Sequence, residues 1–349
     1  MMTENLTLVT TKDAVKIAVW EIFDSEKTHQ LSNVNANNDT VNIGTANKGQ
    51  NIFLTHGTFS DKKTCLRIAE YLAGLGHHCY IMEWRGHGAS AVPKEKFNFE
   101  TVATYDFAAT FDYLLNQLKL TNLHCVTHSG GGACLTMFLI QNPQYINKIN
   151  SVSMFACQVY GAIVSPKNYF KIIAAKIFTH LFGYIPAQKL KLGPINESHH
   201  TMSQWYEWNL HKNFHSSFIK KSDIDANGIK KSAFGSKTRQ QNTIDSEIFD
   251  YRQYMPNITI PIYAISAKGD KFISPTLGCQ SLFNDFNNPL NNNSTNHNFV
   301  NSNLANVFRE YARSHGDLDD YTHSRILNSR TAAKEIWPTV AAWIDQHAG

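Results

Sequence analysis

A serine followed by three glycines is the stretch of this sequence best suited to chemistry. Residues 123–135 read LHCVTHSGGGACL, and Ser129 stands at the centre. The apolar pair Cys125 and Val126 predicts a buried strand before the serine, and the apolar spacing after Ala133 predicts a helix. The glycines permit a turn too tight for side chains. Such a turn lifts a serine hydroxyl above the end of a strand, where it can act as a nucleophile.

A serine hydroxyl is a weak nucleophile and needs a base, which a third group must orient. Asp270 and His323 supply these groups, in the chain order Ser129, Asp270, His323. Asp270 follows the predicted buried strand 261–267, and His323 lies in a polar loop after a predicted last strand, 306–311. We therefore predict that these three residues form a catalytic triad.

Two other interpretations of the acid and base remain open at this stage. His315 lies in the same loop as His323 and also precedes a glycine, so it is a second candidate for the base. Asp270 stands just before a helix that the apolar pattern predicts from Phe272 onward, and it could serve only as the N-cap of that helix.

The charge that develops on a substrate carbonyl oxygen would be held by two backbone N–H groups. One is that of Gly130, directly after the nucleophile. The other is that of Thr58, which follows His56-Gly57 at the end of the predicted strand 51–55, with Phe59 as a less favoured donor. We expect Thr58 and Gly130 to form an oxyanion hole.

The elements that must position these residues alternate between strands and helices, which predicts a parallel sheet whose active site lies at the carboxyl ends of the strands. A hairpin of strands 6–10 and 14–22 precedes the alternation. Further strands are predicted at 51–55, 79–82, 149–157, 261–267 and 306–311, with helices after residue 61, at 101–118, after residue 133, from 272 and at 331–346.

The alternation stops between residues 158 and 257, which we interpret as a helical lid inserted between core segments 1–157 and 258–349. Ser165 and Pro166 begin one lid helix with good N-terminal chemistry. Its apolar stripe is either packing or a wall of an acyl pocket, and lysines beside it would suit a transient contact with a membrane surface. The candidate substrate-binding residues are Phe59, Phe170, Ile173, Phe178 and Trp205.

With these parts in order, the sequence resembles the α/β-hydrolase family, and looks closest to lidded serine esterases, monoacylglycerol lipases and serine aminopeptidase-type hydrolases. The motifs that carry the resemblance are His56-Gly57, Arg85-Gly86-His87-Gly88-Ala89-Ser90, the turn at Ser129, the Asp270 and His323 loops, and Glu335-Ile336-Trp337-Pro338. Two positions depart from the family pattern, Thr127 before the serine and Glu83 before Arg85.

The resemblance implies an α/β-hydrolase fold, with a mostly parallel eight-stranded sheet, helices on both faces and an inserted helical lid. It also implies hydrolysis of a small ester or lipid-like substrate with an apolar acyl group, through an acyl-enzyme on Ser129. There are two alternatives to this function. The protein could be an acyltransferase with the same triad, or a catalytically silent binding protein of this fold. Relatives that attack with a carboxylate are disfavoured, because Ser129 occupies that position.

Composition excludes several other functions. The 349 residues carry 32 basic and 28 acidic side chains, and this formal charge of +4 does not favour nucleic-acid binding. His211 and His215 have metal-ligand spacing, near His199 and His200, but no cysteine or carboxylate completes a set, so we expect no metal and no cofactor.

Location is predicted from what the sequence lacks. Six scattered cysteines, a polar start without signal-peptide character and no long apolar run favour the cytoplasm. The oligomeric state is not predicted.

Overall fold

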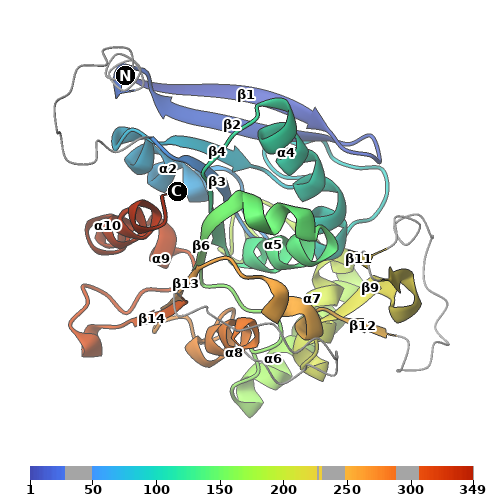
Figure 1. Cartoon of the computed structure of the whole chain (residues 1–349). Helices are drawn as coiled ribbons and strands as arrows, with labels where there is room; N and C mark the ends of the chain where they lie inside the picture. Colours follow the sequence, from blue (N-terminus) through green and yellow to red (C-terminus); the bar gives the residue numbers. More distant parts are fainter. Residues whose placement is uncertain (28–48, 226–227, 230–247, 288–305, 349) are drawn as a thin grey trace, which may run out of the picture.

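An eight-stranded sheet is the frame of the molecule (Figure 1). The computed structural model describes residues 1–27, 49–225, 228–229, 248–287 and 306–348. Within them the strand order is β1-β2-β4-β3-β5-β6-β13-β14. The bounds are β1 Met2–Thr10, β2 Lys16–Asp24, β3 Asn51–Thr55, β4 His78–Met82, β5 Leu123–His128, β6 Ile149–Phe155, β13 Ile262–Ala267 and β14 Val307–Tyr311.

Strand directions follow the prediction. β1 pairs antiparallel with β2 as the expected edge hairpin, and β2 pairs antiparallel with β4. All pairs from β4 to β14 are parallel. The predicted mostly parallel eight-stranded sheet is therefore confirmed.

Helices cover both faces because the buried strands carry apolar side chains on both sides. In β3, Ile52 and Leu54 join one core cluster and Phe53 joins the other, as the period of two requires. The first cluster includes α2 Lys63–Gly74, α9 Arg325–Asn328 and α10 Arg330–Gln346. The second includes α3 Phe99–Thr101, η1 Val102–Phe107, α4 Ala108–Asp112, η2 Tyr113–Gln117, α5 Gly130–Gln141, η3 Pro143–Lys148 and α8 Thr276–Phe286.

Between β6 and β13 the chain leaves the sheet. Two helices dominate this segment, and α6 lies at the outside of the molecule, away from β1 and β2 (Figure 1). A small apolar cluster that includes Ile172, Met202 and Tyr206 packs the helices on Phe59 of the core. The elements of the segment are α6 Pro166–Phe182, β7 Tyr184–Ile185, β8 Glu197–Ser198, α7 His199–His211, β9 His215–Lys220, η4 Lys221–Asp223, β10 Ile224–Asp225, β11 Gly228–Ile229, β12 Ile248–Asp250 and η7 Tyr251–Asn257.

The structure differs from the sequence prediction near the acid loop. The helix expected from Phe272 begins only at Thr276, because Pro275 precedes it and the N–H groups of residues 272–274 point to the Asp270 side chain. That helix continues to Phe286, into the start of the asparagine-rich stretch 284–303. Most of the polar stretches 24–50, 222–241 and 284–303 lies outside the described residues.

Of the helices in the described parts of the chain, none combines the length and the apolar character needed to cross a bilayer.

Candidate active site

Ser129 occupies a strained turn between β5 and α5. Its backbone has φ 54° and ψ −125°, values that a residue with a side chain rarely adopts. The Ser129 N–H donates to the carbonyl of Phe155 at the end of β6, at 2.9 Å, which holds the turn against the sheet. Strain of this kind persists only where the surroundings enforce it, and it is typical of functional sites.

Thr127, the departure from the family pattern, is accommodated by a glycine and a cysteine. Its Oγ1 lies 3.7 Å from Cys157 Sγ, and both side chains face Gly132 at the start of α5. A Cβ on Gly132 would lie 2.5 Å from Cys157 Sγ, so only glycine fits there. The larger residue before the turn is tolerated because the third glycine leaves room for it.

The structure brings the three predicted triad residues together. His323 Nε2 lies 2.8 Å from Ser129 Oγ, and His323 Nδ1 lies 2.6 Å from Asp270 Oδ2. A carboxylate accepts only, so Nδ1 carries a proton and the lone pair of a neutral ring faces the serine. This arrangement can move a proton from the Ser129 hydroxyl to His323.

Asp270 is fixed by its own loop. Its carboxylate accepts the N–H groups of Ile273 and Ser274, both at 3.0 Å, so the donors lie in the loop and not in the first turn of a helix. Burial alone would raise the pKa of Asp270, but His323 and the loop donors outweigh it and hold the pKa below its usual value. The carboxylate is therefore charged and can stabilise a protonated His323.

His315, the alternative candidate for the base, and His128, which precedes Ser129 in the chain, have other contacts. His315 is exposed and lies 3.8 Å from Glu310, whereas His323 is the histidine at Ser129. His128 donates from Nε2 to the carbonyl of His323 at 2.9 Å. Burial lowers the pKa of His128 to about 3, so its ring is neutral and acts as a brace under the His323 loop.

The predicted oxyanion donors lie beside the serine. Gly57 approaches so closely that a Cβ on it would lie 2.7 Å from Ser129 Cβ, which brings the start of the Thr58–Phe59 turn to the nucleophile. The Gly130 N–H belongs to the first turn of α5, whose amides lack partners within the helix. The Phe59 N–H donates to Glu197 Oε1 at 3.1 Å, so Phe59 is not the free donor.

Glu197 is a site residue that the sequence reasoning missed. This buried side chain of β8 accepts from the Phe59 N–H and from His87 Nε2, the latter at 2.8 Å. His87 Nδ1 also donates, to the carbonyl of Arg85 at 2.9 Å, so both ring nitrogens carry protons. Burial would lower the pKa of His87, but the Glu197 carboxylate outweighs burial and raises it. No motif in the sequence marks this pair.

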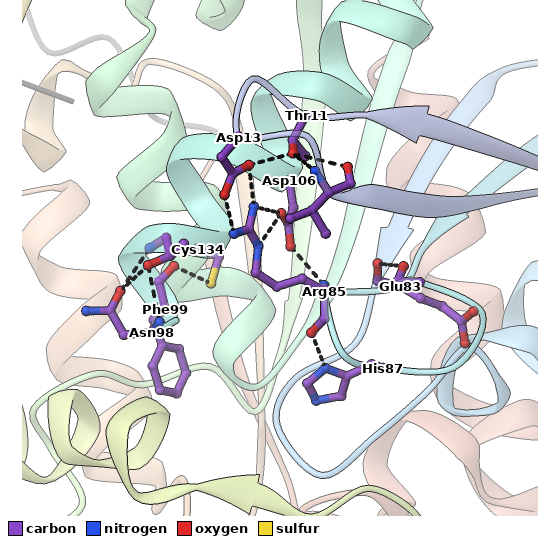
Figure 2. Close-up of polar contacts among 12 residues, drawn as sticks. Thr11, Asp13, Glu83, Arg85, His87, Asn98, Phe99, Asp106 and Cys134 are labelled. Atoms are coloured by element: carbon purple, nitrogen blue, oxygen red, sulfur yellow. Dashed lines mark hydrogen bonds and ion pairs between the residues drawn. The ribbon is translucent and has the colours of Figure 1, made fainter. Parts of the chain in front are cut away.

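Ion pairs and hydrogen bonds of Arg85 and Glu83 hold the loop after β4. The Arg85 guanidinium bonds Asp13 in the β1–β2 turn at 2.6 Å and Asp106 in η1 at 2.8 Å (Figure 2). Glu83, the second departure from the family pattern, accepts from the N–H groups of Lys62 and Ala89. Both residues brace the loop that carries His87.

A largely apolar cavity of about 480 Å³ opens beside Ser129. Three of the predicted substrate-binding residues, Phe59, Phe178 and Trp205, line it. Phe170 and Ile173 do not, and Phe170 is 67% exposed. Other lining residues come from α3, β7, α7, the loop between β7 and β8 and the loop after β13, and include Phe99, Ile185, Leu190, Leu192, Met202, Tyr206, Trp208, Phe272 and Ile273.

The prediction for Phe170 and Ile173 was wrong because α6 turns a different side to the cavity. Ala174, Ala175, Phe178 and Thr179 line it instead. Apolar side chains of α6 lie both at the cavity, as Ala174 and Phe178, and outward, as Phe170, so the apolar pattern could not single out the inner face.

The histidines predicted to have metal-ligand spacing do not form a metal site in the described part of the chain. There, no group of three or more His, Cys, Asp or Glu side chains could hold a metal ion. His211 contacts Glu207, and His215 lies 3.9 Å from Asp250.

Comparison with known proteins agrees with this architecture. Residues 50–303 match the family of the alpha/beta hydrolase fold. No curated protein matches the sequence. Among solved structures, an esterase from Pyrococcus furiosus is similar at 13% identity and TM-score 0.57, over 100% of this chain and 92% of that one.

Two further structures are alike to a similar degree. An esterase from Exiguobacterium antarcticum has 14% identity and TM-score 0.54, over 97% of this chain and 98% of that one. A putative aryl esterase from Burkholderia cenocepacia has 13% identity and TM-score 0.53, over 98% and 99%. The family match covers well over half of the 349 residues, so this chain belongs to the α/β-hydrolase fold family.

Proposed function

We propose that this protein is a serine hydrolase that cleaves a carboxylic ester with an apolar acyl group. The observation that carries the proposal is the pair of short contacts from His323, at 2.8 Å to Ser129 Oγ and at 2.6 Å to Asp270 Oδ2. The esterase names of the similar structures agree with it, although their identities of 13–14% speak for the fold alone.

In the proposed reaction, Ser129 Oγ attacks the ester carbonyl while His323 Nε2 takes its proton. Asp270 stabilises the resulting imidazolium through the charge that its low pKa maintains. The N–H groups of Gly130 and Thr58 hold the oxyanion, and each such donor is worth about 3 kcal/mol in related sites. His323 then protonates the leaving alcohol, and a water molecule releases the acyl group from Ser129 by the same steps in reverse.

The preference for an apolar acyl group rests on the cavity. Its walls include aromatic and aliphatic side chains of the β6–β13 segment, such as Phe178 and Met202. Burying an acyl chain against such walls contributes about 0.8 kcal/mol per methylene. A volume of about 480 Å³ lies within the range of small-molecule sites.

A fluorophosphonate probe and a series of p-nitrophenyl esters test this function. We expect the protein to be labelled and to hydrolyse acetate to decanoate esters, with kcat/KM rising with chain length. Ser129→Ala should abolish both labelling and turnover. Ser281→Ala, which changes an exposed serine on α8, is the matched control and should leave both intact.

Two results would contradict the proposal. Labelling that survives Ser129→Ala would place the nucleophile elsewhere. Release of p-nitrophenol only when an alcohol is added, with transfer of the acyl group to that alcohol, would identify an acyltransferase.

A further inference from the structure

The outward face of α6 carries an apolar stripe. Phe170, Ile177 and Leu181 are 67%, 55% and 72% exposed. Their spacing of seven and four residues places them along one side of the helix. The residues that α6 buries, Asn168, Ile172 and Thr179, lie on the opposite side. A helix whose apolar side faces away from its own protein exposes a surface that can bind another apolar surface.

This stripe continues to the mouth of the cavity. Phe178, Leu190 and Leu192 line the cavity and are still 40%, 54% and 43% exposed. We call these three residues together with Phe170, Ile177 and Leu181 the α6 outer surface. The α6 outer surface is therefore continuous with the lining of the cavity beside Ser129, because Phe178, Leu190 and Leu192 belong to both.

The charged side chains of residues 165–196, the segment that contains the α6 outer surface, are all lysines. From residue 113 to residue 196 the sequence contains no aspartate or glutamate. Lys167 and Lys171 on α6, with Lys189 and Lys191 beside the cavity mouth, are exposed. Lys176 pairs with Glu207 of α7 at the inner edge, which leaves the other four lysines as the positive charges that flank the apolar side chains.

We propose that the α6 outer surface docks on a lipid surface that carries negative charge. Exposed aromatic and aliphatic side chains flanked by lysines are the features by which a helix lies in the plane of an anionic bilayer. A second copy of this chain fits less well, because a symmetric contact would bring four lysines against the same four. This proposal goes beyond the proposed function, since docking requires no catalysis.

Vesicle flotation with the full chain tests the docking. The background is Ser129→Ala in every sample, so no lipid can be cleaved and a failure of the proposed hydrolysis does not affect the result. We expect binding to phosphatidylcholine vesicles that contain phosphatidylglycerol, weak binding to pure phosphatidylcholine, and a loss of binding with added salt.

Two double variants examine separately the apolar and the electrostatic contributions to vesicle binding. Phe170→Ser with Leu181→Ser should weaken binding by about tenfold or more, because it removes apolar side chains that would enter the bilayer. Lys167→Gln with Lys189→Gln should weaken binding to anionic vesicles by about tenfold. Leu6→Ser with Leu8→Ser is the matched control, because it removes two exposed leucines on β1 at the far side of the molecule (Figure 1).

Three results would overturn the proposal. The first is no flotation with anionic vesicles, and the second is flotation that the Phe170 and Leu181 variant leaves unchanged. The third is a dimer in light scattering that this variant converts to a monomer, with no vesicle binding, which would identify a self-association face.

Discussion

Glu197 is the residue that joins the β6–β13 segment to the predicted oxyanion turn. One oxygen of its buried carboxylate accepts hydrogen bonds from the Phe59 N–H and from His87 Nε2. The Ile195 N–H donates to the Phe59 carbonyl at 3.2 Å, so Phe59 is held on both sides of its left-handed backbone, φ 64°. Glu197 therefore holds the residue that directly follows Thr58, the predicted second oxyanion donor.

Removing this carboxylate should slow the reaction without weakening substrate binding. We expect Glu197→Ala to lower kcat by about tenfold, with KM for a short ester nearly unchanged, because the Phe59 N–H loses its acceptor while the walls of the cavity from α6 and α7 remain. Glu197→Gln keeps an oxygen for the Phe59 N–H and should restore most of kcat. Steady-state kinetics on p-nitrophenyl butyrate measure both. An equal loss in the two variants would contradict a role through the Phe59 contact.

At the scale of elements, α6 serves two surfaces at once. One side, with Ala174, Ala175 and Phe178, lines the cavity. Another carries Phe170 and Leu181 outward. Small residues on the inner side leave space in the cavity, so Phe178 is the large side chain that α6 contributes to its wall.

Two phenylalanines on this helix offer a direct comparison. Phe178→Ala should reduce kcat/KM for octanoate esters by about tenfold relative to acetate, because a wall of the acyl site is lost. Phe170→Ala, measured in solution without vesicles, should leave this ratio unchanged because Phe170 does not line the cavity. A ratio that changes equally in both variants would show that α6 acts through helix packing and not as a wall.

For the whole molecule, buried histidines couple stability to pH. Burial lowers the pKa of His56 and His128 to about 3 and that of His124 to about 4. The unfolded chain binds protons at these residues from about pH 6.5 downward while the folded chain does not. His87 has the opposite sign: its raised pKa stabilises the fold at low pH, and that contribution is lost as pH rises.

The free energy of unfolding should therefore fall as pH drops from about 6.5 towards 4. Below pH 6.5 His87 is protonated in both states and adds no slope. The three rings whose pKa falls to about 3 or 4 therefore contribute up to about 4 kcal/mol per pH unit, at about 1.4 kcal/mol each, and His77, whose pKa burial also lowers, acts in the same direction. Urea denaturation at pH 7.5, 6.5 and 5.5 measures this slope. His124→Asn should reduce it by about one histidine's share, and a stability that rises on acidification would contradict the assignment of neutral buried rings.

The sequence by itself determined the sheet and the positions of Ser129, Asp270 and His323 at its edge. Each strand is a short local run of apolar residues, and the turn glycines lie beside the serine in the chain. A few consecutive residues are therefore enough to predict these features. Parallel strands then bring their carboxyl ends to one edge, which is why residues 53 positions apart, Asp270 and His323, meet.

Only the tertiary structure decided the inner face of α6 and the role of Glu197. A helix with apolar side chains both at the cavity and on its outward side has no pattern that tells the two apart, so Phe170 was predicted in place of Ala174. Glu197 lies 138 positions from Phe59 and 110 from His87. A contact over such separations leaves no local pattern, because it exists only once the segment has packed on the core.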